Sequence, residues 1–237
     1  MRNIAFIFAR GGSKGLPRKN IKQLLGKPLI VYSIEKAFEC HEIDAVFVST
    51  DDAEISKIAR ACGAQIINRP SHLASDNSPE WLSWQHAIKY TQDRIGKFDN
   101  FVSLPATSPL RSVDDIEKAI AERIATDTDA CLGISASHHS PYFNMVTRDS
   151  HGFCRLVIPP DKPISRRQDA SAIFNITTIV YVLKPEYVLK GSSIFQGNVS
   201  AIEIPRERAI DIDDDFDFRL AELVLQERLK YDNNSSK

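Results

Sequence analysis

Short apolar strands and amphipathic helices alternate along the first 135 residues, and this order constrains the fold more than any other feature. A helix between successive strands makes a crossover, which brings the strands into a parallel sheet with helices on both faces. Ligands bind such sheets beyond the carboxyl ends of the strands. The predicted strands are Ile4 to Ala9, Ala45 to Ser49, Gln65 to Ile67, Asn100 to Leu104 and Ala130 to Ile134.

Helices are predicted between these strands from apolar periodicity and from start and stop signals. Gly63 closes the second helix, as glycine commonly does at helix ends. The sequence therefore predicts an α/β fold with a mostly parallel, twisted sheet. The predicted helices are Pro28 to Cys40, Ala53 to Cys62, Pro79 to Ile95, Ser112 to Thr126 and, near the end of the chain, Phe216 to Lys230.

The pattern becomes irregular between residues 135 and 178, which predicts an arm that leaves the sheet. Residues 145–157 resemble a hairpin, and such an arm can complete a site or pair with a partner subunit. Two further strands, Thr178 to Leu183 and Val199 to Ile204, precede the closing helix, whose leucines fall on one side. We expect one domain over residues 1–230, with the arm inside it, and a polar tail over 231–237.

Composition favours an enzyme that acts on small molecules. The chain has 237 residues, 43% of them hydrophobic, which is enough to bury a full core. Its 30 basic and 31 acidic residues give no general attraction to nucleic acid or to a membrane surface. Any binding of anions must therefore come from local clusters of charge.

Cysteine usage and the lack of long apolar runs indicate a cytoplasmic protein. Cys40, Cys62, Cys131 and Cys154 have no metal-ligand spacing and lie in or near apolar runs, so we expect buried free thiols. The apolar run at the start is too short for a signal peptide, and no segment approaches the roughly 18 apolar residues of a membrane span. The adjacent His138 and His139 are expected to be polar loop surface.

A glycine-rich, basic loop follows the first predicted strand, from Arg10 to Asn20. Glycines let the backbone approach a ligand closely, and successive N–H groups then converge on an anion. Arg10, Lys14, Arg18 and Lys19 add positive charge. The loop lacks the Gly-Lys-Ser/Thr of a Walker A motif and the Gly-x-Gly-x-x-Gly of a dinucleotide site. It indicates a different site for a polyanion such as a nucleoside triphosphate; the alternative is a strand-to-helix turn with solvated lysines.

An acidic segment follows the last predicted strand. Asp211 and Asp213 are two residues apart and would point the same way in an extended segment. Paired carboxylates suit Mg²⁺, which prefers oxygen ligands and shares substrate phosphates. Asp214 and Asp215 precede the closing helix, where acidic residues act as caps. We therefore assign the first pair to a metal and the second pair to the helix terminus.

These motifs together resemble the acylneuraminate cytidylyltransferases, also called CMP-N-acetylneuraminic acid synthetases, which join CTP to a nine-carbon 2-keto sugar acid. The resemblance covers residues 1 to about 225. It implies a Rossmann-like nucleotidyltransferase fold and a homodimer whose subunits exchange an arm. The matching segments are 9–20, Val48 to Asp52, Arg69-Pro70, Leu73 to Asp76, Thr107 to Arg111, Arg167-Gln168 and Ile210 to Asp213.

The resemblance also implies roles for the residues that match the motifs. Arg10 and Lys19 hold the triphosphate and, with Asp211, serve catalysis. Asp211 and Asp213 match the acidic pair that handles Mg²⁺ and the attacking hydroxyl, and an arginine fork suits a carboxylate. The implied nucleotide-binding residues are Arg10, Gly11, Gly12, Ser13, Lys14, Lys19, Asn20, Arg69, Asn77 and Ser78, and the implied sugar-binding residues are Thr107, Arg167 and Gln168.

The predicted reaction is attack of the anomeric 2-hydroxyl of a sialic-acid-like sugar acid on the α-phosphorus of CTP, which gives a CMP-sugar and pyrophosphate. Pro105-Ala106 replaces the family's usual glutamine, and Thr177-Thr178 replaces an Asn-Gly pair. Both departures fall at sugar-contacting positions, so the acceptor is less defined than the nucleotide. Alternatives are a legionaminate, a pseudaminate or an eight-carbon ulosonate as acceptor, another NTP, and a nucleotide-binding module without catalysis.

Overall fold

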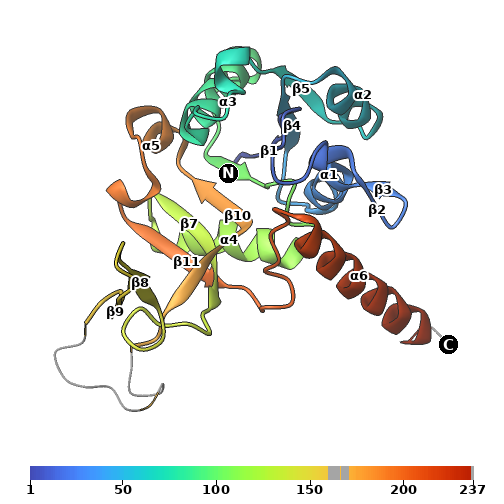
Figure 1. The fold of residues 1–237 in the computed structure, drawn as a ribbon. Coiled ribbons are helices and arrows are strands. Elements are labelled where there is room, and N and C mark those ends of the chain that lie inside the picture. Colours follow the sequence, from blue (N-terminus) through green and yellow to red (C-terminus); the bar gives the residue numbers. More distant parts are fainter. Residues whose placement is uncertain (160–165, 167–170, 236–237) are drawn as a thin grey trace.

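One sheet of seven strands forms the centre of the molecule (Figure 1). The structure is a computed structural model that describes residues 1–159, 166 and 171–235. β10 runs antiparallel to both of its neighbours, and the other pairs are parallel, which confirms the predicted sheet. The order across the sheet is β11 (Val199–Glu203), β7 (Ala130–Ala136), β10 (Phe174–Leu183), β6 (Asn100–Ser103), β1 (Asn3–Phe8), β4 (Ala45–Thr50) and β5 (Gln65–Asn68).

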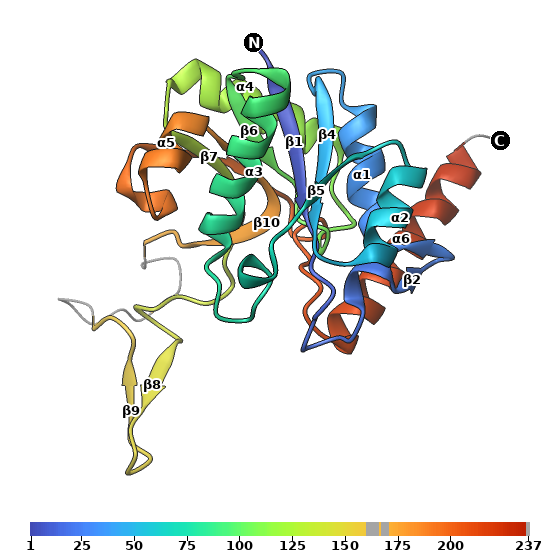
Figure 2. The ribbon, with the colours of Figure 1, turned by 90° about the horizontal axis from the view of Figure 1, so that it is seen from above.

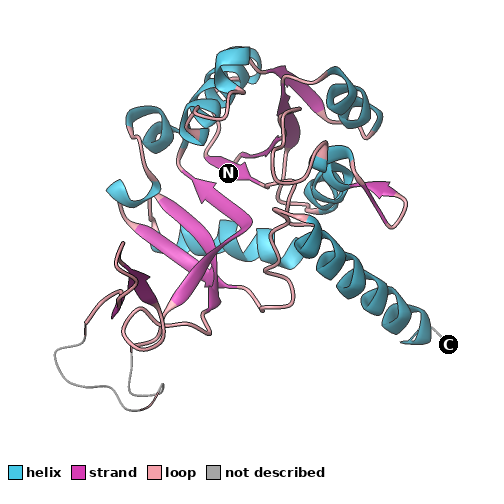
Figure 3. Ribbon diagram, in the orientation of Figure 1, coloured by secondary structure: helices cyan, strands magenta, loops and turns pink. Residues whose placement is uncertain are grey.

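Helices cover both faces of the sheet, as Figures 2 and 3 show. β1 explains why, because its successive side chains are buried on opposite faces. Ala5 and Ile7 join the core beneath one group of helices, while Ile4 and Phe6 join an aromatic-rich core beneath the other. The first group is α1 (Leu29–Glu39), α2 (Ala53–Ala61) and α4 (Val113–Thr126), and the second is α3 (Glu80–Ile95) and α5 (Pro185–Lys190).

The last helix, α6 (Asp215–Ser235), packs at the side of the sheet and then extends away from it (Figure 1). Phe218 and Ala221 are buried in a small core with Leu24 and Leu29. The helix continues past its predicted end at Lys230, because no glycine or proline interrupts residues 231–235. The predicted apolar side is largely exposed, since the buried side chains come from the opposite side of the helix.

A short hairpin of β8 (Val146–Arg148) and β9 (Cys154–Leu156) projects from the body (Figures 1 and 2). The hairpin predicted over residues 145–157 is confirmed. Its position corrects one expectation for the cysteines: Cys154 is exposed on the hairpin. Cys40 and Cys131 are buried as predicted, Cys62 is half-buried, and all four thiols are free.

The remaining differences from the predicted elements are small. β10 begins at Phe174 rather than Thr178, because its first residues extend the pairing with β7 toward the arm. A 3₁₀-helix over Lys19–Ile21 and two short strands, β2 (Gln23–Leu24) and β3 (Lys27–Pro28), occupy what was predicted as loop. Across the part of the chain that the structure describes, no helix has the length and apolar character needed to cross a membrane.

Candidate active site

A cavity of about 540 Å³ lies at the carboxyl edge of the sheet. It opens where β1 and β6 adjoin, which is the point at which successive strands are added in opposite directions. The loops over residues 9–20, 70–79 and 205–214 meet at this edge (Figure 2). The lining residues are Phe8, Arg10, Ser13, Lys14, Gly15, Lys19, Asn20, Arg69, Leu73, Ser75, Asp76, Ser78, Glu80, Ser83, Thr107 and Asp213.

The basic loop is held in place by its own residues and by the acidic segment. The buried Asn20 side chain donates a hydrogen bond from Nδ2 to the Arg10 carbonyl oxygen at 3.1 Å, which ties the two ends of the loop together. At Gly15, a Cβ atom would lie 2.5 Å from the Asp213 carbonyl oxygen, so this close approach requires glycine. The sequence indicated a glycine-rich turn but did not identify Gly15 as a contact to the acidic segment.

The predicted cations gather on the cavity, and carboxylates pair with them. Arg10 and Lys14 both contact Asp76, at 2.8 and 2.6 Å. Lys19 contacts Asp213 at 3.0 Å and also donates to the Ile212 carbonyl oxygen. Hydrogen bonds from Lys14 and Arg10 hold the pKa of Asp76 below its usual range. A triphosphate that binds these cations must take the place of Asp76.

The two glycines after Arg10 belong to the loop but not to the cavity wall. Gly11 donates its N–H to Asp51 Oδ1 at 3.1 Å, and a Cβ atom there would lie 2.7 Å from Asp52 Oδ2. Gly12 is exposed and has open space beside it. Gly11 therefore keeps the loop close to the end of β4, and Gly12 leaves its backbone accessible.

Arg69 lies at the carboxyl end of β5 and forms a second wall of the cavity. Its guanidinium donates to the Ser49 carbonyl oxygen at 2.7 Å and to Ser49 Oγ at 3.2 Å, and it lies over the Phe8 ring. Burial lowers the pKa of Arg69, against the raising effect of nearby acidic groups. Ser78 lines the cavity as predicted, whereas Asn77 is exposed outside it in the turn that precedes α3.

The acidic segment is anchored to the opposite loop by the Ile212 N–H, which donates to the Thr107 carbonyl oxygen at 2.9 Å. Asp213 is exposed and lines the cavity, whereas Asp211 lies behind the lining and is partly buried. Burial raises the pKa of Asp211, the Thr107 hydroxyl opposes this, and the charge of Asp213 raises the pKa further. Asp211 Oδ1 is buried without a hydrogen-bond partner.

These two carboxylates fit a magnesium ion that shares a triphosphate. Mg²⁺ commonly uses one or two carboxylates together with substrate phosphates and waters. A divalent cation would supply the partner that the buried Asp211 Oδ1 lacks. In the described residues there is no cluster of three or more His, Cys, Asp or Glu side chains arranged to hold a metal, so the protein alone does not form a complete cage.

The next acidic residues cap α6, as predicted. Asp214 Oδ1 accepts a hydrogen bond from the Asp217 N–H at 3.0 Å, and Asp217 Oδ2 accepts from the Asp214 N–H at 3.1 Å. This reciprocal pair is a capping box, and acidic charge there favours the positive end of the helix. Asp215 forms ion pairs with Lys22 and Arg219 in the same region.

The predicted sugar-binding residues are only partly placed. Thr107 lines the cavity, and behind it Ser108 Oγ lies 2.6 Å from Thr178 Oγ1. Arg167 and Gln168 lie outside the described residues. His138, predicted as loop surface, contacts Arg206 with a Nε2···NH1 distance of 2.7 Å.

The most prominent residues that the sequence analysis missed are Asp76 and Glu80. Asp76 belongs to one of the motifs, but its position gave no sign that it would pair with two cations of a distant loop. Glu80 begins a helix, where an acidic residue needs no further explanation. Its position on the cavity depends on how α3 is packed, which a single sequence does not show.

Comparisons with known proteins agree with this site. A family model described as "Cytidylyltransferase" matches residues 4–132. The chain is 31% identical to "Pseudaminic acid cytidylyltransferase" of Campylobacter jejuni, over 94% of this chain and 96% of that protein. It is 29% identical to "CMP-N,N'-diacetyllegionaminic acid synthase" of the same species, over 92% of this chain and 93% of that protein.

The fold is also similar to a solved structure of CMP:2-keto-3-deoxy-manno-octonic acid synthetase complexed with CTP. The TM-score is 0.72, the sequence identity is 16%, and the match covers 96% of this chain and 100% of that one. At this identity the likeness supports the fold. The nucleotidyltransferase fold predicted for the chain is therefore confirmed.

Proposed function

Since the chain belongs to the cytidylyltransferase family and is a nucleotidyltransferase, we propose that it joins CTP to the anomeric 2-hydroxyl of a sialic-acid-like 2-keto sugar acid. The products are a CMP-sugar and pyrophosphate. The observation that carries the proposal is the meeting of Arg10, Lys14 and Lys19 with Arg69 and Asp213 around one cavity. The names of the two Campylobacter relatives support a nonulosonic acid as acceptor.

The basic loop binds the triphosphate in this proposal. Arg10 and Lys19 neutralise negative charge on the phosphates as it shifts toward the leaving pyrophosphate, which is the main catalytic need in phosphoryl transfer. Ser13, Lys14 and Asn20 complete the loop around the phosphates and nucleoside, beside the exposed backbone of Gly12. Arg69, fixed by Ser49, stands at the nucleoside end.

Asp211 and Asp213 hold Mg²⁺ in this proposal, and the ion supplies charge neutralisation to the phosphate oxygens when bound. Asp211 also accepts the proton of the attacking 2-hydroxyl. Its raised pKa makes it a better base than an exposed aspartate, because a carboxylate in a less polar site binds a proton more tightly. The oxygen then bonds to the α-phosphorus, and the bond to the β-phosphate oxygen breaks.

The direct test is release of pyrophosphate from each of the four common NTPs with a panel of 2-keto sugar acids and Mg²⁺. We expect CTP with a nonulosonate to be the most productive pair, with a CMP-sugar detected by mass spectrometry. Release with an eight-carbon ulosonate alone would assign the alternative acceptor, and release with UTP in place of CTP would contradict the proposed nucleotide. No release from any pair would contradict the proposed function.

A further inference from the structure

Glu80 is the first residue of α3, and it lines the same cavity as the basic loop. The charge of Arg69 lowers the pKa of Glu80 and that of Asp211 raises it, so the carboxylate is within electrostatic reach of both groups. Asp211 is the residue proposed to receive the proton of the attacking hydroxyl. Glu80 therefore lies on the side of the cavity that faces the reacting end of the acceptor.

Polar atoms without partners surround this carboxylate. Trp84 follows Glu80 by one helical turn, and its indole N–H is buried with no hydrogen-bond partner. The Ser78 hydroxyl, on the cavity wall just before α3, is also buried without a partner. A buried polar group that lacks a partner is costly, and in an empty binding site it marks where a ligand can supply one.

The charges divide the cavity into two parts. Arg10, Lys14 and Lys19 lie on the basic loop, where phosphates belong. Glu80 and Asp211 add negative charge at the other part, which repels phosphate and carboxylate groups. This part suits neutral groups that donate hydrogen bonds, because an ionised carboxylate is only an acceptor. Such groups on a nonulosonate are hydroxyls and acylamino N–H groups.

The neighbouring loop does not supply an equivalent side chain. At Pro105-Ala106, where related proteins were expected to have glutamine, Ala106 is buried and carries no polar group. The Pro105 carbonyl oxygen is already used, since it accepts hydrogen bonds from Arg111 and Ser33. A polar contact to the acceptor must therefore come from another element, and Glu80 is a charged side chain in position to make it.

We propose that Glu80 accepts a hydrogen bond from a hydroxyl or acylamino N–H of the acceptor sugar acid and so helps to determine which acceptors are used. This inference rests on the proposed function, because it needs an acceptor in the cavity. Glu80 acts on binding of the acceptor and leaves binding of CTP to the basic loop. The residue is a specificity determinant rather than a base, since Asp211 takes the proton.

The test is the steady-state kinetics of Glu80→Gln, with each substrate varied in turn. Glutamine keeps the size of the side chain, removes its charge and replaces one acceptor oxygen with a donor. We expect KM for the acceptor to rise about ten-fold or more, as for loss of a hydrogen bond to a charged group. KM for CTP should change by less than about two-fold. Glu80→Asp keeps the charge on a shorter side chain and should give a smaller loss.

Asp93→Asn is the matched control, because it removes a negative charge from an exposed position on the same helix. It should leave both KM values unchanged. Far-ultraviolet circular dichroism and CTP binding establish that each variant is folded. If Glu80→Gln fails to fold, the Glu80→Asp kinetics alone decide: an increase confined to the acceptor KM supports the proposal, and an unchanged acceptor KM overturns it.

Two acceptors distinguish the donor groups. N,N'-diacetyllegionaminate carries acylamino groups, whereas 2-keto-3-deoxy-manno-octonate carries hydroxyls alone. A loss in Glu80→Gln that is confined to the first acid assigns an N–H, and an equal loss with both assigns a hydroxyl. An unchanged acceptor KM, or a change confined to CTP, overturns the proposal while the proposed function stands. A wild-type enzyme inactive with every acid overturns both.

Discussion

Asp76 shows how single residues prepare this site for its ligand. Its carboxylate contacts Arg10 and Lys14 in the cavity, where a triphosphate would bind. The pairing keeps two cations from repelling each other, but it also competes with the nucleotide for them. We predict that Asp76→Asn lowers KM for CTP by about two- to five-fold, which is the range expected for exposed ion pairs.

The change in KM should shrink as ionic strength rises, because salt screens exposed charges. Steady-state kinetics at low and high salt measure it. Asp114→Asn is the matched control, since it removes the partner of Lys118 in an exposed ion pair away from the cavity. A higher KM for CTP in Asp76→Asn would show that Asp76 assists nucleotide binding instead.

Lys19 and Asp211 are the residues whose loss should most reduce turnover. We predict that Lys19→Ala and Asp211→Asn each lower kcat by about 10²-fold or more, because each removes a charge that acts on the reacting groups. Thermal unfolding should show that both variants remain folded. Lys22→Ala is the control, since its partner Asp215 lies outside the cavity wall. Near-wild-type turnover in either variant would contradict its assigned role.

Local sequence predicted the chemistry of the site better than its pairings. A run of glycines and cations shows that a loop can hold an anion, and this placed Arg10, Lys14 and Lys19 correctly on one cavity. The contact of Asp76 with that loop joins distant segments. The position of Glu80 depends on how α3 sits on the sheet. Neither is visible without the fold.

Among the elements, the loop before the acidic segment is fixed to α4 by Arg208 and Asp115. The carboxylate of Asp115 is buried and accepts hydrogen bonds from Arg208 at 2.6 and 3.0 Å, and from the Ser112 N–H at 2.9 Å. We predict that Asp115→Asn lowers the free energy of unfolding by about 3 kcal/mol, because it leaves the arginine without its partner. Urea denaturation at neutral pH measures the change.

The stability that Asp115 contributes should depend on pH. Burial tends to raise the pKa of Asp115, but the hydrogen bonds from Arg208 and Ser112 outweigh it, so the pKa in the folded protein is lowered. The contribution is therefore complete above the unfolded-state pKa of about 3.9 and is lost as the pH falls through the folded-state value.

The difference between wild type and Asp115→Asn should accordingly shrink in acid. Asp114→Asn, at the neighbouring exposed position, should cost less than about 1 kcal/mol at any pH. A difference for Asp115→Asn that stays constant as the pH falls below about 4 would contradict this account.

The elements themselves were predictable where apolar periodicity is strong. The predicted helices and parallel strands up to residue 135 agree with the structure to within about a turn of chain, since their side chains pack on one core. β10 was harder, because its pairing with β7 is irregular between Ile176 and Tyr181. The short strands β2 and β3 have too few residues to show a period.

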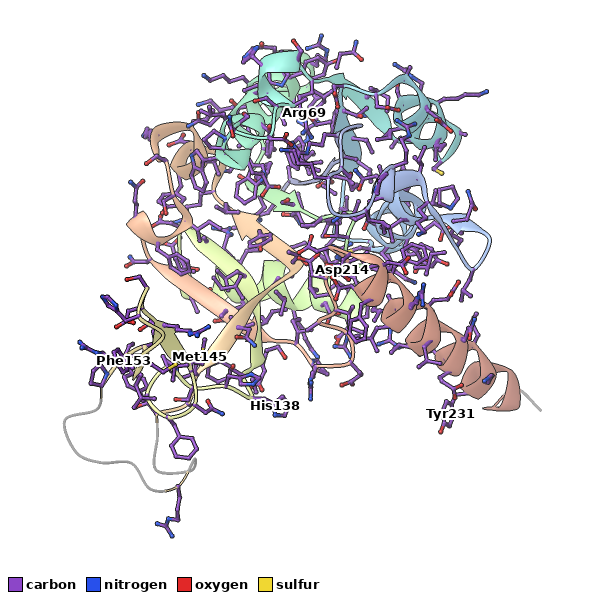
Figure 4. All side chains as sticks on the ribbon, in the orientation of Figure 1. Arg69, His138, Met145, Phe153, Asp214 and Tyr231 are labelled. Carbon is purple, nitrogen blue, oxygen red and sulfur yellow. The ribbon has the colours of Figure 1, made fainter. Side chains whose placement is uncertain are left out.

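At the scale of the whole molecule, the projecting hairpin indicates a partner. Met145, Val146 and Phe153 are 41%, 56% and 70% exposed, and Figure 4 shows Met145 and Phe153 on the hairpin, away from Arg69 and Asp214. A two-stranded hairpin alone is marginally stable, and exposed apolar groups favour contact with another surface. We propose that a second copy of the chain covers the hairpin in a homodimer.

We predict that the wild-type protein sediments as a dimer, and that Val146→Asp combined with Phe153→Asp shifts it toward the monomer. Charged side chains at these positions would have to be buried in the interface at high cost. Phe195→Asp is the control, because Phe195 is 63% exposed but lies outside the hairpin. A wild-type monomer at micromolar concentration, or dissociation caused equally by the control, would contradict the proposal.

The contacts of Lys19 and Gly15 with Asp213 have a consequence for how the protein is made. They join segments separated by nearly the whole length of the chain. During synthesis the basic loop emerges early, and the acidic segment emerges only after the entire sheet has been translated. Contacts between such distant segments form late in folding, because closing a long loop costs chain entropy. A nascent chain therefore carries a phosphate-binding loop long before it has an active site.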